Sequence, residues 1–141
     1  MQIIQFFDYD RNSNLRNKKR LKAYIFDLLL KEKRNPKNVS YIFCSDDHLL
    51  KINRKFLKHD YYTDVISFDL SESPKRIDAE IYISIDRVRD NAAKEGVSFR
   101  EELHRVVFHG TLHLCGYKDK KRGEVARMRK RENRYLNKYF N

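Results

Sequence analysis

The pattern of apolar and polar positions predicts four strands in the first two thirds of the chain. Short runs rich in branched and aromatic side chains, bounded by polar or turn-forming residues, are typical of strands. In the last run, Ile81, Ile83 and Ile85 alternate with more polar residues, which indicates one buried and one more exposed face. The predicted strands cover residues 3–7, 39–44, 64–70 and 80–85.

Between and after these strands, apolar residues recur at the spacing of a helix with one buried face. The predicted helices are one with apolar positions from Leu15 to Leu29, a short one after Ser45 or Asp46, one from about Asp86 to Gly96, one from Ser98 to Gly116 and one from about Glu124 to Tyr139. In the short helix, Leu49, Ile52 and Phe56 are expected on one face. The last helix is expected to turn Val125, Met128, Tyr135 and Leu136 inward and its many lysines and arginines outward.

This order of elements predicts an α+β fold, with a small, mixed four-stranded sheet packed with about five helices. Ser98 and Glu101 match the capping box that begins a helix, and Gly116 is suited to end it. This helix is apolar on most of its surface, so we expect it to lie centrally in the core. The chain has no linker, repeat or low-complexity segment, so residues 1–141 are interpreted as one domain.

The charge balance favours a polyanionic partner. The chain has 31 lysines and arginines against 20 aspartates and glutamates, a formal net charge of +11. Such a surplus repels itself unless an anion or salt compensates it, so nucleic acid is the first expectation and an acidic membrane surface the second. Two cysteines without repeated spacing exclude a disulfide framework or a cysteine-based zinc ribbon. No apolar stretch is long enough to span a bilayer, and the start lacks a signal-peptide pattern, so we expect a cytoplasmic protein.

One segment combines residues that typically bind a metal, from His109 through Gly110, His113 and Gly116 to Asp119. His109 and His113 are one helical turn apart, so both imidazoles can reach one ion from the same face. Gly116 allows the chain to reverse after the helix, which would bring Asp119 back as a third ligand. Three protein ligands leave one tetrahedral position open, as in catalytic zinc sites. The segment predicts one zinc ion at the end of the central helix, although another divalent ion would also fit these ligands.

The same histidine spacing occurs in metzincin zinc peptidases, whose signature places a glutamate directly after the first histidine. That glutamate is the general base of peptide hydrolysis. Here the position is Gly110, so the metal ligands are present and the base is missing. We expect Gly110 to leave space beside the ion for a large substrate such as a phosphodiester.

The segments just described resemble the YbeY family of bacterial metal-dependent endoribonucleases. The resemblance rests on HGTLHLCGY (residues 109–117), on TDVISF (residues 63–68), on the spacing between them and on EIYIS (residues 80–84), and it covers nearly the whole chain. It implies a zinc-binding α+β fold, single-strand-specific RNA cleavage, and roles in 3′-end maturation of small-subunit ribosomal RNA and in ribosome quality control. His109 would then be catalytic through the ion and its activated water, with no separate general base assigned.

Two positions depart from the common family pattern. The usual third ligand is a histidine, whereas Asp119 is anionic and should make the ion a weaker Lewis acid with a less acidic water. We therefore expect a more alkaline activity optimum than in a three-histidine relative. An arginine that the family commonly has before TDV is replaced by Leu57, so Arg54 or Lys58 could take its place in contacting RNA, together with Lys118.

Other functions remain open at this point. The chain could be a zinc metallopeptidase-like hydrolase, or a non-catalytic ribosome-binding factor in which zinc only staples the helix end. The candidate RNA contacts also have an ordinary explanation, because surface lysines are usually solvated. Tyr61, Tyr62 and Tyr117 could stack on unpaired bases or simply pack against the protein.

Overall fold

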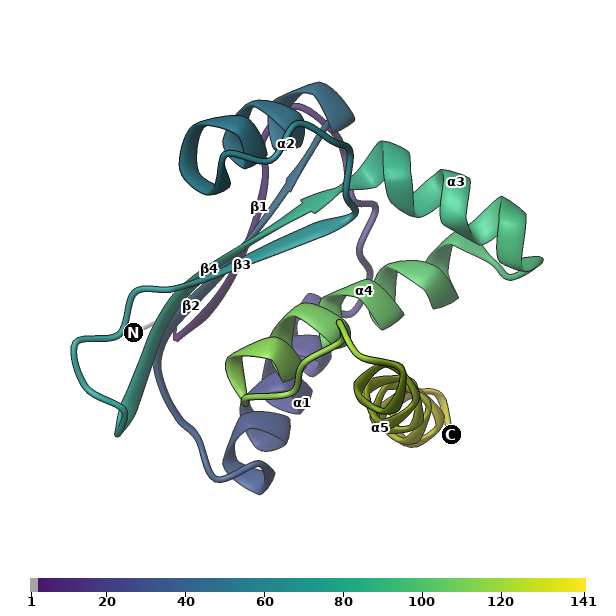
Figure 1. The fold of residues 1–141 in the computed structure, drawn as a ribbon. Helices are drawn as coiled ribbons and strands as arrows, with labels where there is room; N and C mark the ends of the chain where they lie inside the picture. Colours follow the sequence, from purple (N-terminus) through teal and green to yellow (C-terminus); the bar gives the residue numbers. More distant parts are fainter. Residues whose placement is uncertain (1–2) are drawn as a thin grey trace.

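The computed structural model describes residues 3–141 and contains the mixed four-stranded sheet that the sequence predicts (Figure 1). The strands are β1 (Ile4–Asp8), β2 (Asn35–Cys44), β3 (Val65–Asp69) and β4 (Arg76–Ser84). They lie in the order β1-β2-β4-β3, with β1–β2 and β2–β4 parallel and β3–β4 antiparallel. The short edge strand β3 therefore closes a sheet whose other three strands run in one direction.

Helices cover both faces of the sheet unequally. The helices are α1 (Lys18–Lys31), α2 (Asp46–Ile52), the π-helix η1 (Asn53–Leu57), α3 (Ile85–Glu95), α4 (Phe99–Leu114) and α5 (Arg122–Phe140). In Figure 1, α1 and α4 lie below the sheet with α5 packed on α4, whereas α2 lies above it and α3 extends from the end of β4. The larger core fills the layer between the sheet and α1 and α4, where Tyr41, Ile81 and Phe108 are fully buried. The prediction that α4 is a central, buried helix is confirmed. None of these helices is long and apolar enough to cross a bilayer.

Several details differ from the sequence interpretation. Strand β4 begins at Arg76 rather than near residue 80, and β2 begins at Asn35 rather than near residue 39. A register shift between Pro36 and Asn38 accommodates the proline, which cannot donate a ladder hydrogen bond.

Phe56, expected to share a helix face with Leu49 and Ile52, and Val125, expected to point inward, are both exposed. Phe56, on the π-helix η1, is 62% exposed, although it lines one shallow groove together with Ile52 and Phe68. Its ring still meets Phe68 edge-on, with centroids 5.9 Å apart. Val125, in the first turns of α5, is 48% exposed.

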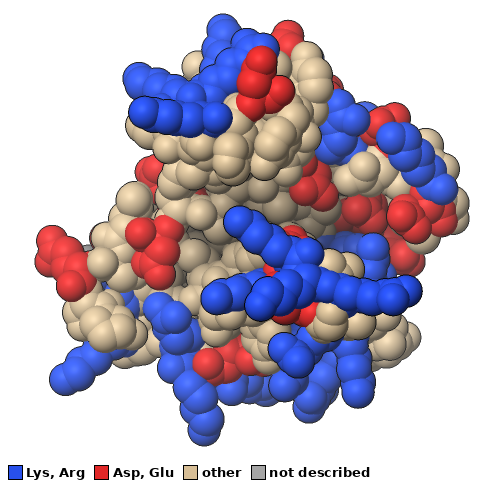
Figure 2. Space-filling view, viewed as in Figure 1, with Lys and Arg blue, Asp and Glu red and all other residues tan. Residues whose placement is uncertain are grey.

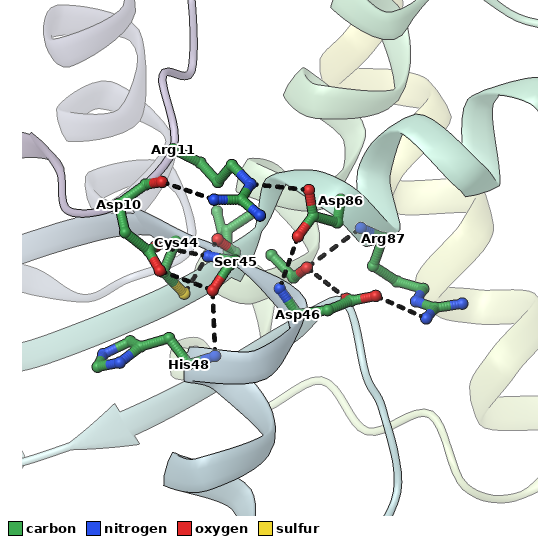
Figure 3. Close-up of polar contacts among 10 residues, drawn as sticks. Asp10, Arg11, Cys44, Ser45, Asp46, His48, Asp86 and Arg87 are labelled. Carbon is green, nitrogen blue, oxygen red and sulfur yellow. Dashed lines mark hydrogen bonds and ion pairs between the residues drawn. The ribbon is translucent and has the colours of Figure 1, made fainter.

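A network of polar side chains joins the starts of α2 and α3 where β2 and β4 end (Figure 3). We call it the cap cluster; it consists of Asp10, Arg11, Ser45, Asp46, Ser84, Asp86 and Arg87. The Ser45 and Ser84 hydroxyls accept the N–H groups of His48 and Arg87, which caps both helices.

Each helix start is also bound by a residue of another segment. Asp86 accepts the backbone N–H of Asp46 at 2.9 Å, and the Ser84 hydroxyl donates to the Asp46 carboxylate at 2.6 Å. Asp10 accepts both the N–H and the hydroxyl of Ser45 at 2.7 Å. The carboxylates of this cluster therefore face hydrogen-bond donors, and the cluster fastens three loops to one another.

Candidate metal centre

The last turn of α4 and the loop after it bring three potential metal ligands together. His109 and His113 follow each other by one helical turn, and their Nε2 atoms are 3.0 Å apart. Gly116 has a left-handed φ of 97°, and the N–H of Tyr117 bonds back to the Leu112 carbonyl at 3.2 Å. This reversal places Asp119 Oδ2 3.0 Å from His109 Nε2 and 3.3 Å from His113 Nε2. The three side chains could hold one metal ion.

The outer nitrogens of both imidazoles are already engaged. His113 Nδ1 donates to the Tyr117 carbonyl oxygen at 2.9 Å, and His109 Nδ1 donates to Glu132 Oε2 at 2.5 Å. A neutral imidazole carries only one N–H, so these bonds leave the Nε2 lone pairs directed at the Asp119 carboxylate. Three acceptors that face one another repel unless a positive charge lies between them. This donor set therefore fits a divalent cation.

A proton competes with the ion for this site. Burial alone would lower the pKa of His109, but the hydrogen bond to Glu132 and the nearby carboxylates of Asp64 and Asp119 raise it above its ordinary value. The surroundings of His109 therefore attract positive charge, either a proton or a metal ion. Because a histidine ligand must be deprotonated, binding of the ion should weaken as the pH falls.

Glu132 of α5 is the residue that the sequence analysis missed. Its side chain is only 5% exposed, and Arg105 Nη1 donates to its second oxygen at 3.0 Å, with Arg129 at 3.8 Å. Burial tends to raise the pKa of this carboxyl, but His109 and Arg105 hold it below its ordinary value, so it stays ionised. A carboxylate that accepts the outer N–H of a metal-binding histidine fixes the ring and its tautomer. The sequence does contain an indication of this role, because Glu132 lies at helical spacing between Met128 and Leu136, on the buried face of α5.

A cleft opens beside this cluster, lined by residues of α3, α4, α5 and the segment before β3. His109 and Asp119 lie on its wall, together with Asp64, Asn91 and Arg105. The Asn91 amide donates to the Asp64 carboxylate at 3.3 Å, and burial raises the pKa of Asp64. The TDV motif thus reaches the candidate site through its aspartate.

The expectation that Gly110 opens space beside the ion is wrong. Gly110 is buried against the sheet, and a Cβ there would lie 2.9 Å from Ile81 Cγ2 and 3.1 Å from Val65 Cγ2. The Ser67 hydroxyl donates to the Gly110 carbonyl at 3.1 Å. Glycine at this position lets α4 approach β3 and β4 closely, which fixes the height of the histidines above the sheet.

The predicted RNA contacts come from two segments, η1 with its C-cap and the loop after α4. Arg54, on η1, forms an ion pair with Asp60, and Lys58 follows directly with a left-handed φ of 55°. Leu57, where the family commonly has arginine, is 40% exposed between them. Lys118 is exposed in the loop next to the metal cluster.

Of the tyrosines that could stack on bases, Tyr61 and Tyr62 are 55% and 51% exposed. Tyr117 is engaged, because its hydroxyl donates to Glu32 and the Arg131 guanidinium lies 5.6 Å from its ring centre. Figure 2 shows lysine and arginine side chains over the α2–η1 segment at the top and over α5 below it, with fewer on the surface between.

Comparisons with known proteins agree with this architecture. The family model "Endoribonuclease YbeY" matches residues 5–140. A protein named Endoribonuclease YbeY from Cytophaga hutchinsonii is 47% identical over 135 residues, covering 96% of this chain and 94% of its own. One of the same name from Flavobacterium psychrophilum is 44% identical and covers 92% of both chains. A solution structure of a Thermotoga maritima protein superposes with a TM-score of 0.65 at 28% identity, over 97% of this chain and 89% of that one. The chain belongs to the YbeY endoribonuclease family.

Proposed function

We propose that the chain is a zinc-dependent endoribonuclease that cuts unpaired RNA, and that His109, His113 and Asp119 hold the ion. The observation that carries this proposal is the convergence of two imidazole Nε2 atoms and one carboxylate oxygen at 3.0 to 3.3 Å. Two nitrogens and one oxygen suit zinc, and three protein ligands leave a position open. When bound, the ion would supply Lewis acidity toward a phosphoryl oxygen or a water molecule.

The surrounding residues divide the remaining tasks. Glu132 and the Tyr117 carbonyl hold the outer protons of the two imidazoles, which orients both rings. Arg105 neutralises Glu132 and lines the cleft, where a guanidinium can meet the negative charge that develops on a phosphodiester. Arg54, Lys58 and Lys118 would contact the RNA backbone around the cleft, with strong salt dependence.

We further propose that the substrate is ribosomal, that the enzyme acts in the cytoplasm on the 3′ end of small-subunit ribosomal RNA and in ribosome quality control, and that residues 1–141 act as one catalytic domain. Membership in the YbeY endoribonuclease family supports RNA as the substrate. The formal net charge of +11 suits a protein that works against a polyanion.

The experiment combines metal analysis of the purified protein with RNA cleavage. We expect about one zinc per chain, cleavage of an unpaired oligoribonucleotide but not of the same sequence in a blunt duplex, loss of cleavage on chelation, and recovery on adding zinc. Precursor small-subunit RNA with an unprocessed 3′ end tests the physiological substrate.

The two rival functions predict other results. A metallopeptidase would turn over casein and leave RNA intact. A ribosome-binding factor stapled by zinc would bind RNA and lose its fold on chelation without ever cutting. Either result from a zinc-loaded, folded protein would overturn the proposal.

A further inference from the structure

The outer face of α5 carries a line of cations that the candidate metal centre does not use. Arg127, Arg131, Arg134 and Lys138 follow each other at four-, three- and four-residue intervals and therefore lie on one side of the helix. We call this line the α5 basic stripe. It spans eleven helical steps, or roughly 16 Å at about 1.5 Å per residue. An adjacent side of α5 holds the buried residues that pack on α4 and support His109.

The stripe lacks acidic compensation along most of its length. Within residues 3–141, Arg127, Arg134 and Lys138 form no ion pair with a carboxylate, and only Arg131 approaches one, Glu32, at 3.8 Å. Like charges three or four residues apart destabilise a helix. The neighbouring cation Lys31, and to a lesser extent Arg134, lowers the pKa of the exposed Lys138, as expected where positive charge accumulates.

Another helix of the same chain neutralises its cations. On α3, Arg87 and Lys94 both pair with Asp90, at 3.1 and 3.3 Å. Among the residues that the structure describes, three of the four cations of the α5 basic stripe have no carboxylate within ion-pair distance. Arg127, Arg134 and Lys138 are therefore available to an external anion.

We propose that the α5 basic stripe binds the backbone of a double-helical RNA segment that flanks the unpaired stretch to be cut. A straight line of charges on a rigid helix suits phosphates held at regular spacing. The exposed stripe carries no aromatic side chain on which unpaired bases could stack, which favours a duplex over a single strand. The stripe also begins near the site, because Arg131 lies over Tyr117 in the turn that carries Asp119.

This inference rests on the proposed endoribonuclease function. It predicts that the enzyme prefers unpaired RNA that lies next to a double-helical RNA stem. The test uses a stripe variant, R127Q/R134Q/K138Q, which spares Arg131 because Arg131 packs on Tyr117. The matched control, K75Q/R76Q/K94Q, removes the same number of exposed cations from the β3–β4 connection, the start of β4 and α3. Three RNAs are compared: a short unpaired oligonucleotide, the same stretch beside a stem, and a blunt duplex.

We expect the stripe variant to bind the blunt duplex on the order of 10-fold more weakly, with a salt slope shallower by about 2 to 3, since each lost phosphate contact removes about 0.9. Its kcat/KM should fall by a similar factor on the stem-flanked RNA and stay within about 2-fold on the short oligonucleotide, which cannot reach the stripe. The control variant should change far less on all three RNAs.

Three results would overturn the inference: equal losses in the stripe and control variants, equal losses on the short and stem-flanked RNAs, or unchanged duplex binding together with lost binding to phosphatidylglycerol vesicles. The blunt-duplex measurement does not depend on cleavage. A wild-type protein that cuts no RNA would refute the proposed function, while a stripe-dependent loss of duplex binding would still support the stripe.

Discussion

The candidate metal cluster of His109, His113 and Asp119, called the metal cluster below, and the cap cluster both contain carboxylates, yet these carboxylates face different groups. In the cap cluster, Asp10 and Asp86 accept from hydroxyl, backbone and guanidinium donors at 2.7 to 3.0 Å. In the metal cluster, Asp119 faces two imidazole nitrogens whose other ring positions already hold their protons. One cluster is complete within the protein, and the other is complete only with an added positive charge.

The hydrogen bonds therefore distinguish a structural cluster from a candidate metal site. A buried polar group with its partners in place stabilises a unique packing, whereas several acceptors turned toward one point mark a place for a cation. A count of acids alone would favour the cap cluster as the cation site, because the cap cluster holds three aspartates and the metal cluster one.

The largest difference between the two clusters should appear in RNA cleavage when one histidine is substituted in or beside each of them. His109→Ala removes a proposed ligand, so RNA cleavage should fall by more than the roughly 10- to 100-fold that loss of an outer-shell partner costs. His48→Ala, which only removes a ring stacked 4.3 Å from Tyr9 beside the cap cluster, should leave cleavage unchanged. Cleavage rates with circular dichroism as a folding control measure both, and similar activity in the two variants would remove the distinction.

Glu132→Gln should give the next largest effect. The variant keeps the size of the side chain but loses the charge that holds the Nδ1 proton of His109, so zinc affinity should drop by about 10- to 100-fold. Competition with a chromogenic chelator measures this affinity. Glu95→Gln, an exposed residue on the same cleft, is the matched control. Equal affinities for wild type and Glu132→Gln would argue against a positioning role.

Ser45→Ala tests the cap cluster by stability alone. Loss of a serine N-cap typically costs about 1 kcal/mol, and here the hydroxyl also binds Asp10. We expect a lower urea midpoint with unchanged cleavage per folded molecule and unchanged zinc affinity. A loss of zinc affinity in this variant would show that the two clusters are coupled.

The two clusters should also differ in pH dependence. Burial tends to raise the pKa values of Asp10 and Asp86, but their hydrogen bonds with Ser45, Asp46 and Arg11 hold both below the ordinary value of 3.8. Their stabilising contribution is therefore present above that value and is lost as the pH falls through the folded-state pKa values. The variant D10N/D86N should show a flatter dependence of the unfolding free energy on pH in acid. An unchanged slope in urea titrations between neutral and acid pH would contradict this assignment.

The smallest expected effect concerns the third ligand. Asp119→His would remove an anionic ligand, so the ion should become a stronger Lewis acid and the activity optimum should move to lower pH, by on the order of one unit or less. Matched pH–rate profiles of wild type and variant with saturating zinc measure the shift. Coincident optima would show that the ligand charge does not set the profile.

Local sequence features were enough to predict most of the fold. Branched residues marked the strands, and Ser98 and Gly116 marked the ends of α4. The longer extents of β2 and β4 were missed because Pro36 and the polar residues near Arg76 resemble a turn and enter the sheet only through pairing with each other. The π-helical turn at Phe56 was not predicted either, because the sequence prediction assumed α-helical spacing throughout this segment.

The candidate site was predicted where its residues are close in the chain and missed where they are distant. His109, His113 and Asp119 lie within one helix and its following turn, so spacing alone brings them together. Glu132 comes from the next helix, and its role depends on how α5 packs on α4. Gly110 was misinterpreted because the spacing does not reveal that the sheet, rather than the ion, lies beside it.

The sharp reversal at Gly116 also bears on the order of events as the chain folds. Because that turn closes only a short loop between the proposed ligands, the entropy lost on bringing them together is small. Nascent α4 and its turn can therefore capture an ion before the sheet assembles, whereas the contacts between Arg11 and Asp86, 75 residues apart, must wait for it. Zinc supplied during refolding should consequently protect amides of α4 earlier than those at the starts of α2 and α3.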